Sequence, residues 1–218
     1  MNNPIRVGLL LHPAFELLDA FGPIEMYSIL GKDRAEIVTI AEKPGPVAAA
    51  MGADGPIAPS VVAQFGFDNA PELDVLVVPG GFGTLTELEN EAILEFLRRV
   101  CPQTEIVTSV CTGSVLLAKA GVLDGYRATT NKQFFSLGRM TNDAVEWVEK
   151  ARWVDAGKFV TSSGVSAGMD MTLAVIARIF DEETARECAS VAEYNWHEDA
   201  DHDPFYADLD KGLAALAG

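Results

Sequence analysis

Three short, nearly continuous apolar runs constrain the fold of this 218-residue chain most strongly. They are rich in β-branched residues, as expected for strands buried on both faces of a sheet, and they cover residues 5–11, 74–79 and 105–110. A turn and a helical pattern follow each run. Because alternating strands and helices form right-handed crossover units, we predict an α/β protein, a three-layer sandwich whose mainly parallel, Rossmann-like sheet lies between helices.

Smaller additions are predicted around this sheet. They are a strand at 35–41, a turn at 44–46 that leads into a peripheral hairpin, a second hairpin around Ala156-Gly157 and a helix at 167–180. The segment 181–210 differs in kind, with eleven acidic residues and one arginine, and we expect a surface helix near 182–195 and then an irregular tail. No linker is evident, so 1–218 is expected to be a single domain in which 181–218 forms the acidic helix and tail.

The formal charge of −16 argues against nucleic acid or an anionic membrane surface as a partner, because both would repel this chain. No apolar stretch approaches the roughly 20 residues that a membrane-spanning helix needs, and no signal peptide is evident. The three cysteines, Cys101, Cys111 and Cys188, form no CxxC pair. We therefore expect a reducing, cytoplasmic setting, with no disulfide framework, metal site or cofactor.

Cys111 is the candidate nucleophile. It stands between the third apolar run and a helical pattern, in Ser109-Val-Cys-Thr-Gly113, where the small residues at both ends fit the tight turn of a nucleophile elbow. The N-terminus of the following helix would favour the thiolate, which predicts an unusually acidic thiol. The alternative is a buried and inert cysteine, since free cysteines are often buried.

Gly80 and Gly81 follow the second run and are the candidate oxyanion and substrate-binding residues. Glycines there allow backbone N–H groups to approach a ligand, together with the amide of Thr112. Either glycine can equally serve only the turn, and Thr112 can equally be an ordinary first-turn residue. His12, at the end of the first run, is either an acid or base at the pocket or, as we favour, a packed turn residue.

An ordered set of motifs resembles the ThiJ/PfpI superfamily, which has a class I glutamine amidotransferase-like fold. The motifs are Leu17-Leu-Asp-Ala-Phe-Gly-Pro23, Val78-Pro-Gly-Gly81, Val107-Thr-Ser-Val-Cys-Thr-Gly113 and Ala128-Thr-Thr130. Within the superfamily they are most similar to the isocyanide (isonitrile) hydratases and to the sensor domains of related transcription regulators. The resemblance implies a homodimer, and an acidic residue from the segment after the first strand that touches the cysteine sulfur.

Two acids are available in that segment, Glu16 and Asp19, and the Asp-x-x-Gly-Pro spacing selects Asp19. A carboxyl group beside a thiolate is expected to hold its proton and then to deliver it. The alternative is an exposed helical aspartate. The resemblance implies cysteine-dependent hydration of an isocyanide, a small electrophile, to an N-substituted formamide, with Cys111, Asp19 and Thr112 as catalytic residues.

Two other functions stay open. One is a non-enzymatic redox or ligand sensor that uses an oxidisable Cys111, and the other is chemistry on reactive carbonyl compounds. Asn131 follows the Ala-Thr-Thr run, where related hydratases usually place a histidine. No histidine adjoins Cys111, which argues against a protease-like dyad of adjacent residues.

Overall fold

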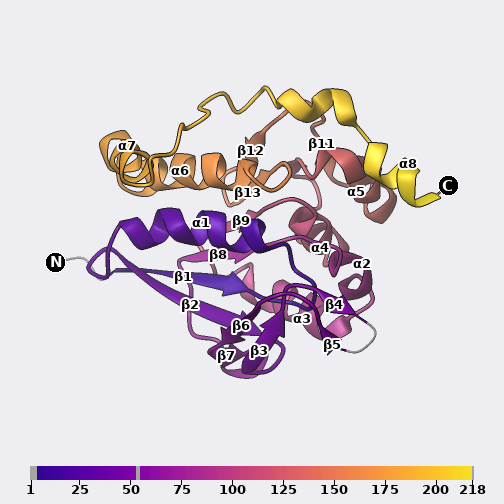
Figure 1. Ribbon diagram of the computed structural model, residues 1–218, viewed down its shortest axis with the longest axis horizontal. Coiled ribbons are helices and arrows are strands. Elements are labelled where there is room, and N and C mark those ends of the chain that lie inside the picture. Colours follow the sequence, from indigo (N-terminus) through magenta and orange to yellow (C-terminus); the bar gives the residue numbers. More distant parts are fainter. Residues whose placement is uncertain (1–3, 53–54, 218) are drawn as a thin grey trace.

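A central sheet of seven strands dominates the computed structural model, which describes residues 4–52 and 55–217 (Figure 1). The strand order is β12-β13-β9-β8-β1-β2-β7, and every neighbouring pair is parallel except β12 with β13. The seven strands are β1 (Ile5–Leu10), β2 (Ala35–Ala41), β7 (Phe65–Gly66), β8 (Val75–Val78), β9 (Ile106–Ser109), β12 (Trp153–Asp155) and β13 (Phe159–Ser162). The predicted mainly parallel α/β sheet is confirmed.

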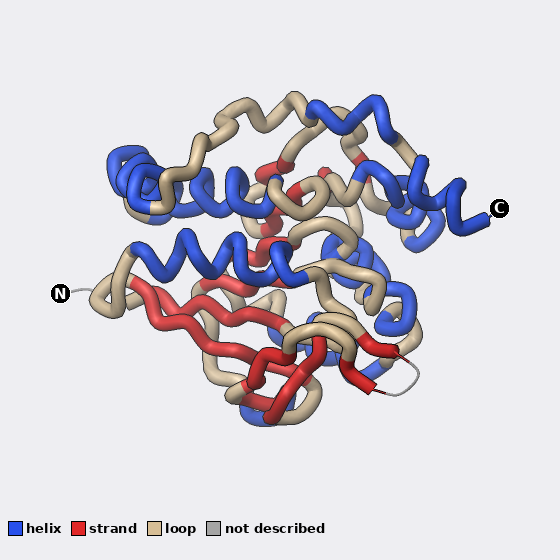
Figure 2. Tube along the Cα trace, in the orientation of Figure 1, coloured by secondary structure: helices blue, strands red, loops and turns tan. Residues whose placement is uncertain are grey.

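Helices cover both faces of the sheet (Figure 2). The described helices are α1 (Leu17–Ile29), α2 (Thr84–Glu87), α3 (Glu91–Val100), α4 (Gly113–Lys119), α5 (Phe135–Thr141), α6 (Ala167–Ile179), α7 (Glu182–Val191) and α8 (Lys211–Ala217), with the 3₁₀ helices η1 (Phe67–Asn69), η2 (Lys132–Phe134) and η3 (Pro204–Asp208). Along β8, Val75 and Val77 belong to the core under α1, α6 and α7, whereas Leu76 and Val78 belong to the core under α3 and α4. This period of two explains why the strand is apolar at every position.

The predicted hairpins are both present. β12 and β13 pair across Ala156-Gly157, and β3 (Gly45–Ala48) pairs with β6 (Ser60–Ala63). Short pairs, β4 (Met51–Gly52) with β5 (Gly55–Pro56) and β10 (Arg127–Ala128) with β11 (Glu146–Trp147), complete the strands. Residues 53 and 54 lie outside the described part of the chain.

The acidic C-terminal part differs from the prediction. α7 ends at Val191, and the segment after it ends in η3 and α8 instead of continuing as an irregular tail. Asp170 of α6 holds the beginning of that segment, because its carboxylate accepts hydrogen bonds from the Tyr194 hydroxyl at 3.0 Å and from the His197 amide at 2.9 Å. Arg152 pairs with the same carboxylate. The segment is therefore fixed through a buried ion pair, which no local pattern reveals.

No described helix combines the length and the hydropathy that crossing a membrane requires.

Candidate active site

Cys111 lies on a strained turn at the carboxyl end of β9. Its φ of 56° is in the left-handed region, which costs a side-chain-bearing residue about 1–2 kcal/mol. The turn is held by its own N–H, which donates to the Ser163 carbonyl at 3.0 Å. A Cβ on Gly113 would lie 2.1 Å from the Val78 oxygen, so only glycine fits two positions after the cysteine. The tight turn predicted from the sequence is thus confirmed.

Asn131 donates a hydrogen bond directly to the Cys111 sulfur. The Nδ2 to Sγ distance is 3.0 Å. The other end of the amide is fixed, because Oδ1 accepts the N–H of Gln133 at 2.8 Å at the start of η2. This hydrogen bond decides which end of the amide faces the sulfur. From the sequence, Asn131 was notable only as a departure from the histidine of related hydratases, and no local pattern predicts its contact with the sulfur.

Asp19 is fully buried in the first turn of α1, and not exposed as the alternative reading had it. Its Oδ2 accepts the N–H of Gly80 at 2.9 Å, and Oδ1 has no hydrogen bond of regular geometry within the described residues. The pKa of this carboxyl is raised to about 7, because burial and the nearby Glu16 raise it by more than the hydrogen bond from Gly80 lowers it. The charge of this carboxyl acts in turn on Cys111, the cysteine that the sequence also singles out.

The predicted acidic thiol is wrong for this pocket. Burial raises the pKa of Cys111 above its ordinary value, and the charge of Asp19 raises it further; the hydrogen bonds from Asn131 and Thr112 lower it by less. The sequence shows the helix that follows the cysteine but not how completely the sulfur is buried. Since two adjacent negative charges are unfavourable, the pair keeps one proton, and the thiolate forms when that proton lies on Asp19.

The candidate oxyanion residues already have partners. Gly80 donates to Asp19, and Gly81 donates its N–H to the Thr112 hydroxyl oxygen at 3.1 Å. Thr112 Oγ1 also lies 2.8 Å from the hydroxyl of Thr84. A Cβ on Gly80 would lie 2.5 Å from the Thr112 nitrogen, so a close backbone approach requires glycine there. Oxyanion binding by Gly80 and Gly81 stays a prediction, and it requires each amide to exchange its acceptor.

The sulfur opens into a small cavity of about 110 Å³. Its walls are mostly apolar, with Glu16, Thr84 and Asn131 as polar members beside the elbow. The apolar wall residues are Phe82, Leu85, Phe134, Leu137 and Val165. The rings of Phe82 and Phe134 meet edge to face at 6.2 Å. A cavity of this size and polarity fits a small uncharged molecule.

The C-terminal segment supports one wall of this cavity. Asp210 accepts hydrogen bonds from the backbone N–H of Ser136 at 2.7 Å and from its hydroxyl at 2.6 Å. Ser136 stands in α5, between the wall residues Phe134 and Leu137. Asp210 also donates its own N–H to the Lys132 carbonyl at 2.8 Å. The acidic tail is therefore part of the site's structure.

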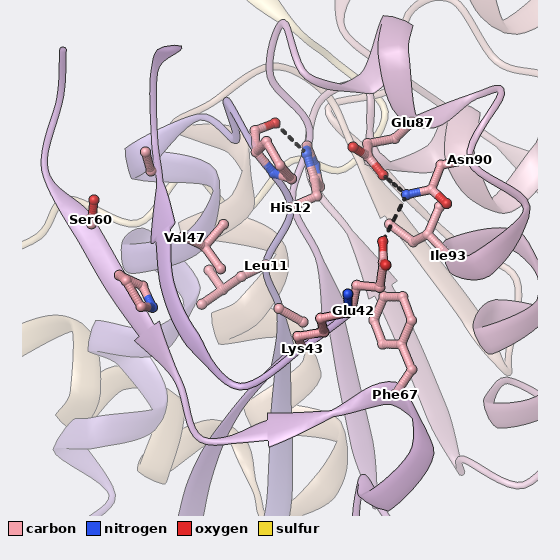
Figure 3. Close-up of a pocket in the computed structure, with 14 residues that line it drawn as sticks. Leu11, His12, Glu42, Lys43, Val47, Ser60, Phe67, Glu87, Asn90 and Ile93 are labelled. Atoms are coloured by element: carbon pink, nitrogen blue, oxygen red, sulfur yellow. Dashed lines mark hydrogen bonds between the residues drawn. The ribbon is translucent and has the colours of Figure 1, made fainter. Parts of the chain in front are cut away.

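His12 does not line the Cys111 cavity. It lies in the wall of a second cavity of about 360 Å³, together with Leu11, Glu42 and Glu87 (Figure 3). This second cavity is the larger, but the candidate nucleophile Cys111 lines the smaller one. We therefore take the Cys111 cavity as the candidate active site.

Comparison with known proteins agrees with this geometry. The model of the DJ-1/PfpI family matches residues 5–178. The chain belongs to the DJ-1/PfpI family. The matched residues run from β1 through the elbow at Cys111 to most of α6, and this range contains every residue of the candidate site except Asp210.

Three relatives show how DJ-1/PfpI proteins diverge. Isonitrile hydratase from Pseudomonas putida is 34% identical over 190 residues, which are 87% of this chain and 78% of that protein. The HTH-type transcriptional regulator GbdR from Pseudomonas aeruginosa is 31% identical over 196 residues, 88% of this chain, but this chain spans only 51% of the regulator. The crystal structure of a ThiJ/PfpI family protein from Pseudomonas syringae superposes with a TM-score of 0.76 at 27% identity, covering 99% of this chain and 91% of that one. The family thus includes both enzymes and regulators.

Proposed function

We propose that this protein hydrates small isocyanides to N-substituted formamides, with Cys111 as the nucleophile and Asp19 as the proton donor. The observation that carries the proposal is the buried pair itself: a fully buried carboxyl whose pKa is raised to about 7, and a cysteine on an elbow on which the charge of that carboxyl acts. The 34% identity to an isonitrile hydratase supports the same chemistry.

The reaction begins with proton transfer from the Cys111 thiol to Asp19. The thiolate then adds to the terminal carbon of R–N≡C, and Asp19 returns the proton to that carbon, which gives a thioimidate, R–N=CH–S–Cys. Water adds to the same carbon. Loss of the thiol releases R–NH–CHO, so that one isocyanide and one water yield one formamide.

Three neighbouring groups have roles in this scheme. Asn131 stabilises the thiolate through its hydrogen bond to Sγ. The Thr112 amide, which lowers the pKa of Cys111, is the candidate donor to the centre where negative charge develops. The Thr112 hydroxyl, held by Thr84, is the candidate group to position water.

The second candidate function is a redox or ligand sensor. It is favoured by the match to GbdR over 88% of this chain. In that case Cys111 would be oxidised to a sulfinic acid that hydrogen-bonds to Asp19. The raised pKa of Cys111 argues against rapid oxidation, because the thiolate is the form that reacts. We also expect a homodimer in a reducing, cytoplasmic setting.

The deciding experiment is formamide production from ethyl isocyanide, followed by NMR of the formyl proton. We expect turnover by the unmutated protein and at least about a thousandfold loss in Cys111→Ala, since removing a nucleophile leaves only binding and electrostatics. Asp19→Asn should also be strongly impaired. No turnover by the unmutated protein would exclude the hydratase function; oxidation of Cys111 alone by peroxide, seen by intact mass, would then favour the sensor.

A further inference from the structure

His12 lies directly behind the active site, at the end of β1. β1 and β8 are adjacent parallel strands with Leu9 opposite Val77, so the residues that follow the two strands also lie side by side. His12 is 2% exposed. One side of its ring forms part of the wall of the second cavity (Figure 3), and the other side faces the Pro79 carbonyl.

Both ring nitrogens of His12 face carbonyl oxygens. Nε2 is 3.2 Å from the Pro79 oxygen in a buried contact, and Nδ1 is 3.1 Å from the partly buried Pro13 oxygen. A neutral imidazole has only one N–H. Within the described part of the chain no other donor reaches either oxygen, and the Pro79 contact is the fully buried one, where a carbonyl without a donor is costly. The proton therefore belongs on Nε2.

The peptide bond that His12 holds is the same one that holds the catalytic acid. The N–H of this Pro79–Gly80 peptide donates to Asp19 Oδ2 at 2.9 Å. In a trans peptide the C=O and the N–H point in opposite directions. His12 and Asp19 therefore contact opposite edges of the same planar peptide group. A donor on the carbonyl also polarises the peptide and strengthens the hydrogen bond that its N–H gives.

The geometry points to His12 as a positioning residue of the active site: its Nε2–H holds the Pro79–Gly80 peptide, and that peptide holds the Asp19 carboxylate against Cys111. This inference rests on the proposed function in one respect: the proposed function makes Asp19 the proton donor. His12 itself does not touch the Cys111 cavity, so it acts on the reaction through Asp19.

Burial keeps the His12 ring neutral, as this role requires. Burial lowers the pKa of His12, and the Glu87 carboxylate raises it by less, so the ring is neutral at physiological pH. Glu87 itself accepts a hydrogen bond from Asn90 at 2.8 Å (Figure 3). The charged or titratable groups around Asp19 are Glu16 and Cys111.

The test compares two amide replacements of nearly equal polarity. The amide nitrogen of His12→Gln occupies the place of Nε2 and can still donate to Pro79, whereas the shorter side chain of His12→Asn ends near Nδ1. The readout is the rate of Cys111 alkylation by iodoacetamide between about pH 5 and pH 9, measured by mass spectrometry of the cysteine peptide. It requires no isocyanide.

We expect an inflection near pH 7 in the unmutated protein, where Asp19 titrates. His12→Asn weakens the hydrogen bond that stabilises the Asp19 carboxylate, so the inflection moves upward by roughly 0.5–1 pH unit, a three- to tenfold change in the equilibrium. His12→Gln returns the inflection to its position in the unmutated protein. Asp19→Asn removes the inflection, both alone and combined with either His12 variant.

Three outcomes would overturn the inference. One is an inflection that His12→Asn does not move, even if the variant melts earlier. Another is a shift that His12→Gln does not reverse. The third is the finding, by ¹⁵N NMR of the unmutated protein, that the His12 proton lies on Nδ1. This measurement is possible even if His12→Asn fails to fold. Absence of isocyanide turnover alongside the expected shift would exclude the proposed reaction but leave the role of His12 standing.

Discussion

The Asn131 side-chain nitrogen lies 3.0 Å from the Cys111 sulfur, although 20 positions separate the two residues in the chain. Asn131 reaches the sulfur because η2 begins beside the elbow and fixes the amide by accepting the Gln133 N–H. The candidate site thus has three main residues: Cys111, the Asn131 amide that donates to its sulfur, and the Asp19 carboxyl whose charge acts on it.

Asn131→Ala should slow Cys111 alkylation by about 10- to 100-fold at neutral pH, because a hydrogen bond to a charged sulfur contributes about 1.5–3 kcal/mol. Asn131→Asp should slow it further, because it places a carboxylate beside the developing thiolate. Iodoacetamide kinetics would measure both. Unchanged rates in both variants would show that the amide does not stabilise the reactive form, and Asn131→His would test whether the histidine of related hydratases can replace it.

The three cysteines should differ sharply in reactivity. Cys111 opens into a cavity, whereas Cys101 is completely buried and its pKa is raised to about 12. Cys188 lies on the buried face of α7. With a limiting amount of iodoacetamide, Cys111 should be labelled at least about tenfold faster than either of the others, because the pKa of each thiol is raised and, within the described residues, only Cys111 is accessible through a cavity. Equal labelling of all three in the folded protein would contradict the assignment of Cys111.

The stability of the protein should depend on pH through Asp19. Its pKa is about 7 in the folded protein and about 3.9 in an unfolded chain. Between these values the folded state binds more protons, so the free energy of unfolding falls as the pH rises from about 4 to about 7. The full difference corresponds to about 4 kcal/mol at most.

Urea denaturation at about pH 5 and pH 8 would test this relation in the unmutated protein and in Asp19→Asn. The variant has no titrating group at this position, so it should lose less stability between the two pH values. Parallel changes in both proteins would mean that Asp19 titrates near its ordinary pKa.

The buried ion pair of Arg152 and Asp170 should contribute far more to the stability of the protein than the partly exposed ion pair of Arg178 and Asp155. Asp170→Asn leaves the Arg152 guanidinium buried beside a neutral group, and we expect a loss of about 3 kcal/mol or more in the free energy of unfolding. Asp155→Asn removes the partly exposed pair with Arg178 and should cost less than about 1 kcal/mol. Urea unfolding measures both, and similar losses would contradict the structural role of Asp170.

Much of the fold could be predicted from the sequence because it depends on local patterns. Buried strands are recognisable as β-branched runs, and the elbow at Cys111 carries its small residues within two positions on each side. Asp19 was also accessible, since a spacing relative to Gly22-Pro23 distinguishes it from Glu16. These features need no knowledge of which distant segments meet.

The rest depended on contacts between distant segments. The raised pKa of Cys111 follows from burial and from a carboxylate 92 positions away in the chain, and the predicted helix effect pointed in the opposite direction. The partners of the Gly80 and Gly81 amides are side chains that the local Gly-Gly pattern does not identify. α8 was missed because the acidic composition before it suggested a solvated tail.

The hydrogen bonds between Asp210 and Ser136 also set the order in which the site is completed during synthesis. The ribosome releases Cys111 and Asp19 well before the residue that anchors α5. In a nascent chain that does not yet include Asp210, Cys111 therefore lies beside a cavity wall that lacks its hydrogen bonds to this residue. The pocket is finished only after Asp210 has been translated, so a residue 99 positions beyond Cys111 completes the cavity around it.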